Sequence, residues 1–414
     1  MTKRVPTRVV AATVAGNALE FFDFVTYSFF AVQIGQTFFP SSNEFTSLLA
    51  SVGVFGVGFV FRPLGGVLIG AYADRAGRRP AMLLTIVLIT IGTMGLALMP
   101  SYASIGVAAP IIVVFCRLVQ GLALGGEVGP ASVFLIEAAP EGKRGLYSSW
   151  QLASQGLAVL AAGLLGLGLA LVLDKEALKL WGWRVPFVLG LLLVPVAFYL
   201  RRAMPETYAR GPRVEQARLG EHARFIVLAV LIILGGTVST YVANYMTTYA
   251  IATLKLPPTT ALTATVVGGV ALFAGALAGG WLSDRYGRRG VMLWPRLLLT
   301  LTTWPLFLLL SRQPNAGTLY FATVVLTVLT AVSSAASLIV IPELLPRSIR
   351  ATGLSIAYAV GVSLFGGSTQ FVITWLLKVT GDPTSPAWYV TVTSVITLAA
   401  MWVMPESRDR NIES

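Results

Sequence analysis

The chain has 414 residues, of which 56% are hydrophobic and 12% are charged, against about 25% charged residues in a typical soluble protein. A water-soluble fold of this length cannot bury so much apolar surface. The composition therefore excludes a nucleic-acid-binding protein, a secreted disulfide scaffold and most soluble enzymes, and it predicts a chain whose partner is the lipid bilayer.

Twelve apolar stretches follow one another along the chain, each long enough to cross a hydrocarbon core of about 30 Å as a helix. The first six lie near residues 9–36, 47–72, 81–99, 106–136, 147–173 and 184–201. The last six lie near 225–251, 260–283, 291–311, 318–341, 352–378 and 387–404. We expect each stretch to form a transmembrane helix.

The net charge of +12 follows the expected topology of these helices. With the N-terminus placed in the cytoplasm, 21 of the 30 Lys and Arg residues fall on the cytoplasmic side and six on the other side. This positive-inside bias predicts that both termini are cytoplasmic. The single cysteine, Cys116, and the single histidine, His222, give no disulfide and no metal site. We expect no cofactor and no nucleic-acid partner.

Three landmarks repeat in the same order in the two halves of the chain. Gly70-x-x-x-Asp74-Arg75-x-Gly77-Arg78-Arg79 returns as Gly280-x-x-x-Asp284-Arg285-x-Gly287-Arg288-Arg289, and Glu137, Pro140 and Arg144 return as Glu343, Pro346 and Arg350. Met204-Pro205-Glu206 returns as Met404-Pro405-Glu406. The repeat predicts a duplicated unit: a six-helix bundle over 1–201, a basic cytoplasmic linker over 202–224 and a second six-helix bundle over 225–414.

These loops resemble the signature loop of the major facilitator superfamily, and Arg117-x-x-Gln120-Gly121 resembles its second motif. Other segments resemble the metabolite:proton symporter branch, and within it the bacterial citrate–proton symporters. They are Gly16-Asn17-x-x-Glu20-x-x-Asp23-Phe24, Arg62-Pro63-Leu64-Gly65, Gly125-Gly126-Glu127, Ser149-Trp150-Gln151, Phe38-Phe39-Pro40, 181–187, Phe365-Gly366-Gly367, Thr380-Gly381-Asp382 and Ser385-Pro386. The resemblance implies an all-α membrane protein with twelve transmembrane helices in two six-helix bundles, the fold of that superfamily.

Charged side chains inside the apolar stretches are candidates for function, because an unpaired charge is costly in the bilayer. Arg117 lies near the membrane midplane, where it is a candidate ligand for a carboxylate, a switching partner of a helix 1 acid, or a purely structural arginine. We expect proton coupling at Asp23 or Glu20, which share one face of the first helix, or at Glu127. A permanent buried network of Glu20 and Asp23 with Arg117, and a gating or packing role for Glu127, are the alternatives. Arg62 and Arg296 are interpreted as structural residues near the inner interface.

Polar side chains that share helix faces are expected to surround the substrate. The candidate substrate-binding residues are Asn17, Tyr27, Arg117, Gln151, Gln155, Tyr241, Asn244, Tyr245 and Ser368. The repeated loops are expected to act as a gate rather than a phosphate site, because they lack a phosphate-binding loop pattern. The candidate gating residues are Asp74, Arg75, Arg78, Asp284, Arg285 and Arg288.

The leading function is import of an organic acid anion, citrate or a similar tri- or dicarboxylate, by proton symport through alternating access. The related symporters imply 2-oxoglutarate, shikimate, proline or betaine as alternatives. An aromatic box for a zwitterion is available from Tyr27, Tyr241, Tyr245 and Trp150. A drug–proton antiporter is disfavoured because the fifth helix lacks the Gly-Pro pair of that class. An intramembrane enzyme lacks histidine chemistry, and an ATP-driven pump lacks room for a nucleotide-binding domain. We expect a multi-pass protein of the bacterial inner membrane that works as a monomer.

Overall fold

The computed structural model describes residues 7–76, 78–125, 135–136, 139–202, 222–346 and 350–408. Helices account for nearly all of this part of the chain. In the first half they are α1 (Thr7–Phe29), α2 (Ala31–Phe38), α3 (Glu44–Val60), α4 (Arg62–Ala76), α5 (Arg78–Leu98), α6 (Tyr102–Ile105), α7 (Ala108–Leu124), α9 (Arg144–Val172), α10 (Lys175–Leu180), η1 (Gly182–Arg184) and α11 (Val185–Arg202). In the second half they are α12 (Ala223–Ala252), α13 (Pro258–Tyr286), α14 (Arg288–Arg312), α15 (Ala316–Leu344), α16 (Arg350–Val360), η3 (Gly361–Gly366), α17 (Gly367–Thr380) and α18 (Ser385–Val403).

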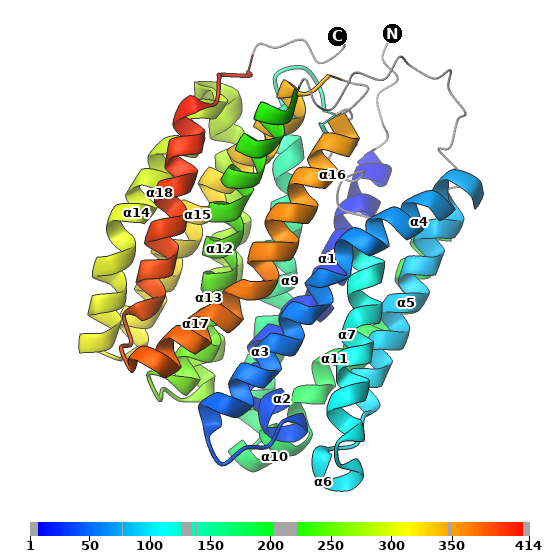
Figure 1. Cartoon of the computed structure of the whole chain (residues 1–414), viewed down its shortest axis with the longest axis vertical. Helices are drawn as coiled ribbons and strands as arrows, with labels where there is room; N and C mark the ends of the chain where they lie inside the picture. The colour runs from blue at the N-terminus through cyan, green and yellow to red at the C-terminus, as the bar shows by residue number, and fades with distance from the viewer. Residues whose placement is uncertain are drawn as a thin grey trace.

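The expected all-α membrane fold is confirmed. In the described residues, each of the twelve predicted stretches contains a long helix or a run of consecutive helices, with ends mostly within a few residues of the prediction. Within the described ranges, eight helical segments are long and apolar enough to cross a membrane, and three shorter apolar helices accompany them. α1 begins and α18 ends at the same end of the molecule, called here the terminal end, and the short α2, α6 and α10 lie at the opposite end (Figure 1).

The expected spans 47–72 and 352–378 are interrupted along their length. α3 ends at Val60 and the helix restarts at Arg62, directly before Pro63, because proline is favoured in the first turn of a helix and disfavoured in its interior. The span over 352–378 changes from α16 through the π-helical turn η3 into α17. Such π-helical turns are frequent at functional sites.

Glycines let helices of the two sequence halves pack with their backbones in contact. α9 packs along α13, where a side-chain carbon on Gly156 would lie 2.6 Å from the backbone nitrogen of Phe273. α3 crosses α17 in the same way, and a side-chain carbon on Gly56 would overlap the carbonyl group of Gly367. In lipid there is no hydrophobic driving force between helices, so close packing through small residues stabilises such crossings instead.

Buried hydrogen bonds at Ser28 join three helices between the central region and the opposite end. The Ser28 hydroxyl accepts from the Gln370 amide of α17, and the Ser28 carbonyl accepts from the Thr248 hydroxyl of α12 at 3.2 Å. Farther out, Lys255 pairs with Glu44 at 3.2 Å. That ion pair is exposed and contributes little to stability, so the buried contacts do more to join the helices at this end.

The close packing of α9 on α13 predicts that adding one methyl group to α9 lowers the stability of the protein at one position and not at another. Gly156→Ala should destabilise the protein by about 1–3 kcal/mol because backbone atoms of α13 cannot move aside easily. Gly168→Ala on the same helix is the control, because a side-chain carbon there meets nothing within 4 Å. Thermal unfolding in detergent measures both variants, and equal melting temperatures for the two would contradict the packing described.

Candidate functional site

A cavity of about 770 Å³ lies between helices of the two sequence halves. α1 and α9 form one wall, and α12, α13, α15, α16 and η3 form the rest. Much of the lining is apolar, so a few polar groups define its chemistry. They are Gln155, Thr237, Thr240, Tyr241, Asn244, Ser334, Ser337 and Tyr358.

Three of the predicted substrate-binding residues line this cavity: Gln155, Tyr241 and Asn244. Asn17 and Gln151 instead bond to each other across α1 and α9, with the Gln151 Nε2 donating to Asn17 Oδ1 at 3.0 Å and Asn17 Nδ2 donating to the Gln151 carbonyl at 3.1 Å. This pair joins two helices of the first half beside the cavity.

The remaining predicted ligands are engaged elsewhere. The Tyr27 hydroxyl donates to the Ser51 carbonyl at 3.0 Å. The Tyr245 hydroxyl shares a hydrogen bond of 2.8 Å with Thr374, and the Ser368 hydroxyl donates to the Leu364 carbonyl of the preceding turn η3 at 2.7 Å. These three side chains do not line the cavity in this conformation.

Arg117 belongs to a buried chain of hydrogen bonds inside the first half. Its Nη1 donates to Gln120 Oε1 at 2.7 Å, and Gln120 Nε2 donates to Asp23 Oδ2 at 2.7 Å and to Thr93 Oγ1 at 3.0 Å. The guanidinium carbon lies 3.7 Å from the centre of the Tyr27 ring. Gln120 therefore links the cation to the acid, an arrangement that favours the switching-partner interpretation of Arg117 over direct contact with a substrate.

Both charged ends of this chain keep free hydrogen-bonding capacity. Arg117 Nε and Nη2 and Asp23 Oδ1 have no partner in the described part of the chain. Asp23 lines a separate cavity between α1, α5 and α11, together with Thr90 and Thr93. Phe21 and Val25 of the same helix line the central cavity, so α1 has the carboxylate on one side and the central cavity on the other.

Arg62, interpreted from the sequence as structural and near the inner interface, is buried beside the central cavity. Its guanidinium carbon lies 3.9 Å from the centre of the Phe59 ring and 5.0 Å from that of Phe24, and it interacts electrostatically with Tyr241 and Tyr358 of the second half. Sequence reasoning singled out Arg62 but did not place it beside the cavity. The signal was the Arg62-Pro63 pair, which restarts the helix and brings the arginine to the cavity.

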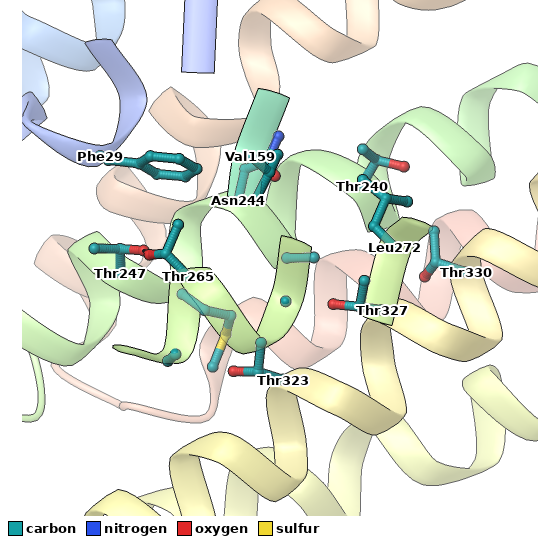
Figure 2. Close-up of a pocket in the computed structure, with 14 residues that line it drawn as sticks. Phe29, Val159, Thr240, Asn244, Thr247, Thr265, Leu272, Thr323, Thr327 and Thr330 are labelled. Atoms are coloured by element: carbon teal, nitrogen blue, oxygen red, sulfur yellow. Dashed lines mark hydrogen bonds between the residues drawn. The ribbon is translucent and has the colours of Figure 1, made fainter. Parts of the chain in front are cut away.

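A second cavity of about 420 Å³ extends from the central one into the second half (Figure 2). The two share Thr240 and Asn244 as lining residues. Threonines dominate its wall: Thr240, Thr247, Thr265, Thr323, Thr327 and Thr330. The hydroxyls of the last three are buried and have no hydrogen-bond partner among the described residues, which gives this uncharged space a few free polar groups.

At the terminal end, a carboxylate of one half caps a helix of the other half. Asp284 accepts hydrogen bonds from the backbone nitrogens of Gly145 at 2.7 Å and Leu146 at 2.9 Å. These are the first free N–H groups of α9, which carry the positive end of its dipole. Arg288 holds the same carboxylate at 2.9 Å.

The three sequence landmarks of the second half meet around this cap. Arg288 also binds Glu343 at 3.1 Å, and Glu343 accepts from the Ser407 hydroxyl at 2.6 Å. Glu406 accepts from the backbone nitrogens of Arg288 and Arg289 at the start of α14. Although burial opposes its ionisation, these N–H groups and those of residues 407 and 408 hold the pKa of Glu406 below its ordinary value.

Several predicted site residues cannot be placed. The side chains of Glu20, Asp74, Arg75 and Arg78 and the whole of Glu127 lie outside the described residues. Arg285 is described, and its guanidinium lies over the rings of Trp281 and Tyr286 at the surface.

Comparison with known proteins gives the family. The model of the Major Facilitator Superfamily matches residues 13–361 and 228–413. The chain belongs to the Major Facilitator Superfamily. It is therefore a multi-pass membrane transporter and not an enzyme.

Two relatives and one solved structure illustrate how far the likeness extends. The chain is 37% identical over 394 residues to a citrate-proton symporter of Salmonella typhi, covering 93% of this chain and 91% of the relative. It is 36% identical over 410 residues to an alpha-ketoglutarate permease of Escherichia coli, covering 95% and 92%. The partially occluded inward-open xylose transporter XylE from E. coli has the same fold, with a TM-score of 0.79 at 18% identity over 98% and 99% of the chains.

The hydrogen bonds that Asp284 accepts at the start of α9 predict that loss of this carboxylate changes the distance between α9 and α13. Asp284→Asn should weaken the bonds to α9 and let the terminal ends of α9 and α13 separate more often, without abolishing solute binding. Electron spin resonance between labels at the exposed residues Glu141 and Tyr286 measures that separation, in a background where Cys116 is replaced by Ser.

Asp174→Asn is the matched control, because Asp174 caps the short α10 within its own half. We expect longer distances for Asp284→Asn and unchanged distances for Asp174→Asn. Identical distance distributions for all three proteins would contradict a gating role for Asp284.

Proposed function

We propose that this chain imports an organic acid anion, citrate or a similar tri- or dicarboxylate, by proton symport through alternating access. The observation that carries the proposal is a cavity between the two sequence halves with a few polar groups on its wall, separated by α1 from the carboxylate that begins the buried chain of Asp23, Gln120 and Arg117. The relatives named for citrate-proton symport and for alpha-ketoglutarate support the substrate class.

Asp23 and Arg117 together provide a physical link between proton and anion. When Asp23 is ionised, it compensates the charge of Arg117 through Gln120. When Asp23 is protonated, the positive charge of Arg117 is uncompensated, and an anion in the neighbouring cavity becomes more favourable. Binding of a proton and binding of an anion then assist each other, as symport requires, and the effect is reciprocal.

The cavity supplies ligands for the remaining oxygens of a carboxylate. The amides of Gln155 and Asn244 and the hydroxyl of Tyr358 are donors on its wall, whereas the Thr240 hydroxyl donates to the Gly236 carbonyl at 2.9 Å. Arg62, beside Tyr241, adds positive charge at the junction of the halves. Charge-assisted hydrogen bonds of this kind are the strong ones in anion recognition.

A zwitterion such as betaine fits the aromatic groups poorly, although proline/betaine transporters are among the relatives at 30% identity. A quaternary ammonium needs free aromatic faces. Arg117 lies over Tyr27, Arg62 lies over Phe59, and Tyr245 is buried against Thr374. Two of the four expected box residues, Tyr27 and Tyr245, are therefore occupied by the protein's own contacts, so a dicarboxylate such as 2-oxoglutarate is the stronger alternative.

We further infer that the terminal end faces the cytoplasm of a bacterial cell and that a monomer carries out transport. The positive-inside bias supports the orientation. Residues 1–201 and 225–414 then act as two bundles that rock about the cavity, joined by the linker 202–224.

Uptake of radiolabelled citrate into proteoliposomes tests the proposal. An inward proton gradient should drive accumulation, and a sodium gradient of the same size should not. Tricarballylate and 2-oxoglutarate should compete, whereas betaine and shikimate should not. Proton-driven uptake of betaine without uptake of citrate would keep the fold and refute the proposed substrate.

Substitution of the buried acid tests the coupling. Asp23→Asn should lower proton-driven accumulation by about tenfold or more, because the side chain can no longer exchange a proton. Citrate counterflow should persist, because it needs no net proton movement. Asp382→Asn is the control, since Asp382 lies in an exposed loop where it bonds Thr384.

The comparison of the two assays decides the outcome. Loss of accumulation with preserved counterflow supports Asp23 as the coupling acid. Undiminished proton-driven accumulation in Asp23→Asn would contradict that role and leave Glu20 and Glu127 as the remaining acids.

A further inference from the structure

Arg296 is a fully buried cation with spare hydrogen-bond donors beside the central cavity. It lies in α14, eight residues from the start of the helix and so about 12 Å from its end. Its side chain is 0% exposed. Nη1 donates to the Gly235 carbonyl at 3.1 Å and to the Ser239 hydroxyl at 2.8 Å, while Nε and Nη2 have no partner in the described part of the chain.

No carboxylate compensates this charge among the ion pairs of the described residues. A lone guanidinium inside a membrane protein is costly, and it persists where it faces a partner or a functional cavity. The two hydrogen bonds to α12 use one of its three nitrogens. A purely structural role would leave the other two donor groups unexplained.

Gly236 opens the wall of the central cavity toward this cation. Gly236 and Ser334 both line the cavity. A side-chain carbon at Gly236 would lie 3.1 Å from Ser334 Oγ and 3.8 Å from Arg296 Nη2. The Ser334 hydroxyl is also buried, and no described residue bonds to it. One cation and one hydroxyl therefore meet at a point that glycine leaves free of side-chain atoms.

We propose that Arg296, Ser334 and Gly236 form a second anion subsite in the wall of the second half, which receives one carboxylate of a polyanionic solute. This inference deepens the proposed function and rests on it for the nature of the solute. The remaining carboxylates lie toward Gln155, Asn244 and Arg62 across the cavity. The subsite therefore sets the preference for three carboxylates over two.

Competition experiments on citrate uptake test the subsite. Tricarballylate, with three carboxylates, and 2-oxoglutarate, with two, are the probes. Arg296→Gln should raise the inhibition constant of tricarballylate about tenfold or more, through loss of a charge-assisted bond, and should change that of 2-oxoglutarate much less. Arg296→Lys keeps the charge and should recover part of the affinity for tricarballylate.

Two further variants separate the subsite from a structural role. Gly236→Ala leaves Arg296 in place but puts a methyl group between it and the cavity, so it should reproduce the selective loss of tricarballylate. Arg312→Gln, on the exposed end of the same helix, should leave both inhibition constants unchanged. Equal changes for the two probes, or a Gly236→Ala protein with unchanged constants, would overturn the proposal.

Thermal stabilisation of the purified protein tests the subsite without transport. Tricarballylate should raise the melting temperature of the wild type and of Arg312→Gln, and should raise it much less in Arg296→Gln and Gly236→Ala. No stabilisation of the wild type would refute the subsite. Stabilisation without any proton-driven uptake would instead refute the symport mechanism and retain the subsite.

Discussion

Lipid provides no partner for a charge, so the buried arginines of this protein define its interior. Arg117 is joined to Asp23 through Gln120, Arg62 lies on aromatic rings, and Arg296 bonds to α12. Each of these cations is only partly satisfied or satisfied by groups that can exchange partners. The helices therefore hold the arginines in place. Because these positive charges are not fully compensated, the cavities beside the arginines remain suited to an anion.

The two ends of the molecule join the sequence halves through different contacts. At the terminal end, carboxylates cap helix N-termini, and Arg288 links Asp284 to Glu343. At the opposite end, buried hydrogen bonds at Ser28 and helix packing join them. Charge-assisted caps depend on a few atoms and break as a unit, whereas packed surfaces separate by sliding. This difference gives each end its own response to changes in the central cavity, which alternating access requires.

The sequence was sufficient for the fold and for part of the site. Hydropathy located the twelve helices, and helix-face arithmetic brought Gln155, Tyr241 and Asn244 to one cavity. It did not predict that Asn17 and Gln151 bond to each other, because helix periodicity gives the face of a residue but not its partner on the next helix. Arg62 and Arg296 were interpreted as structural from their distance to the inner interface. The helix break before Pro63 brings Arg62 beside the cavity, and Gly236 leaves space between the cavity and Arg296. Both effects depend on how neighbouring helices pack, which a single sequence does not show.

The most direct test of the account is whether the solute itself carries protons inward. Citrate is added to lightly buffered proteoliposomes with no imposed gradient, and a pH electrode records the external medium. Coupled import predicts an alkaline shift on addition of citrate, which is absent in protein-free vesicles and strongly reduced in Asp23→Asn. Citrate entry without any proton movement, or with an absolute need for sodium, would contradict the account.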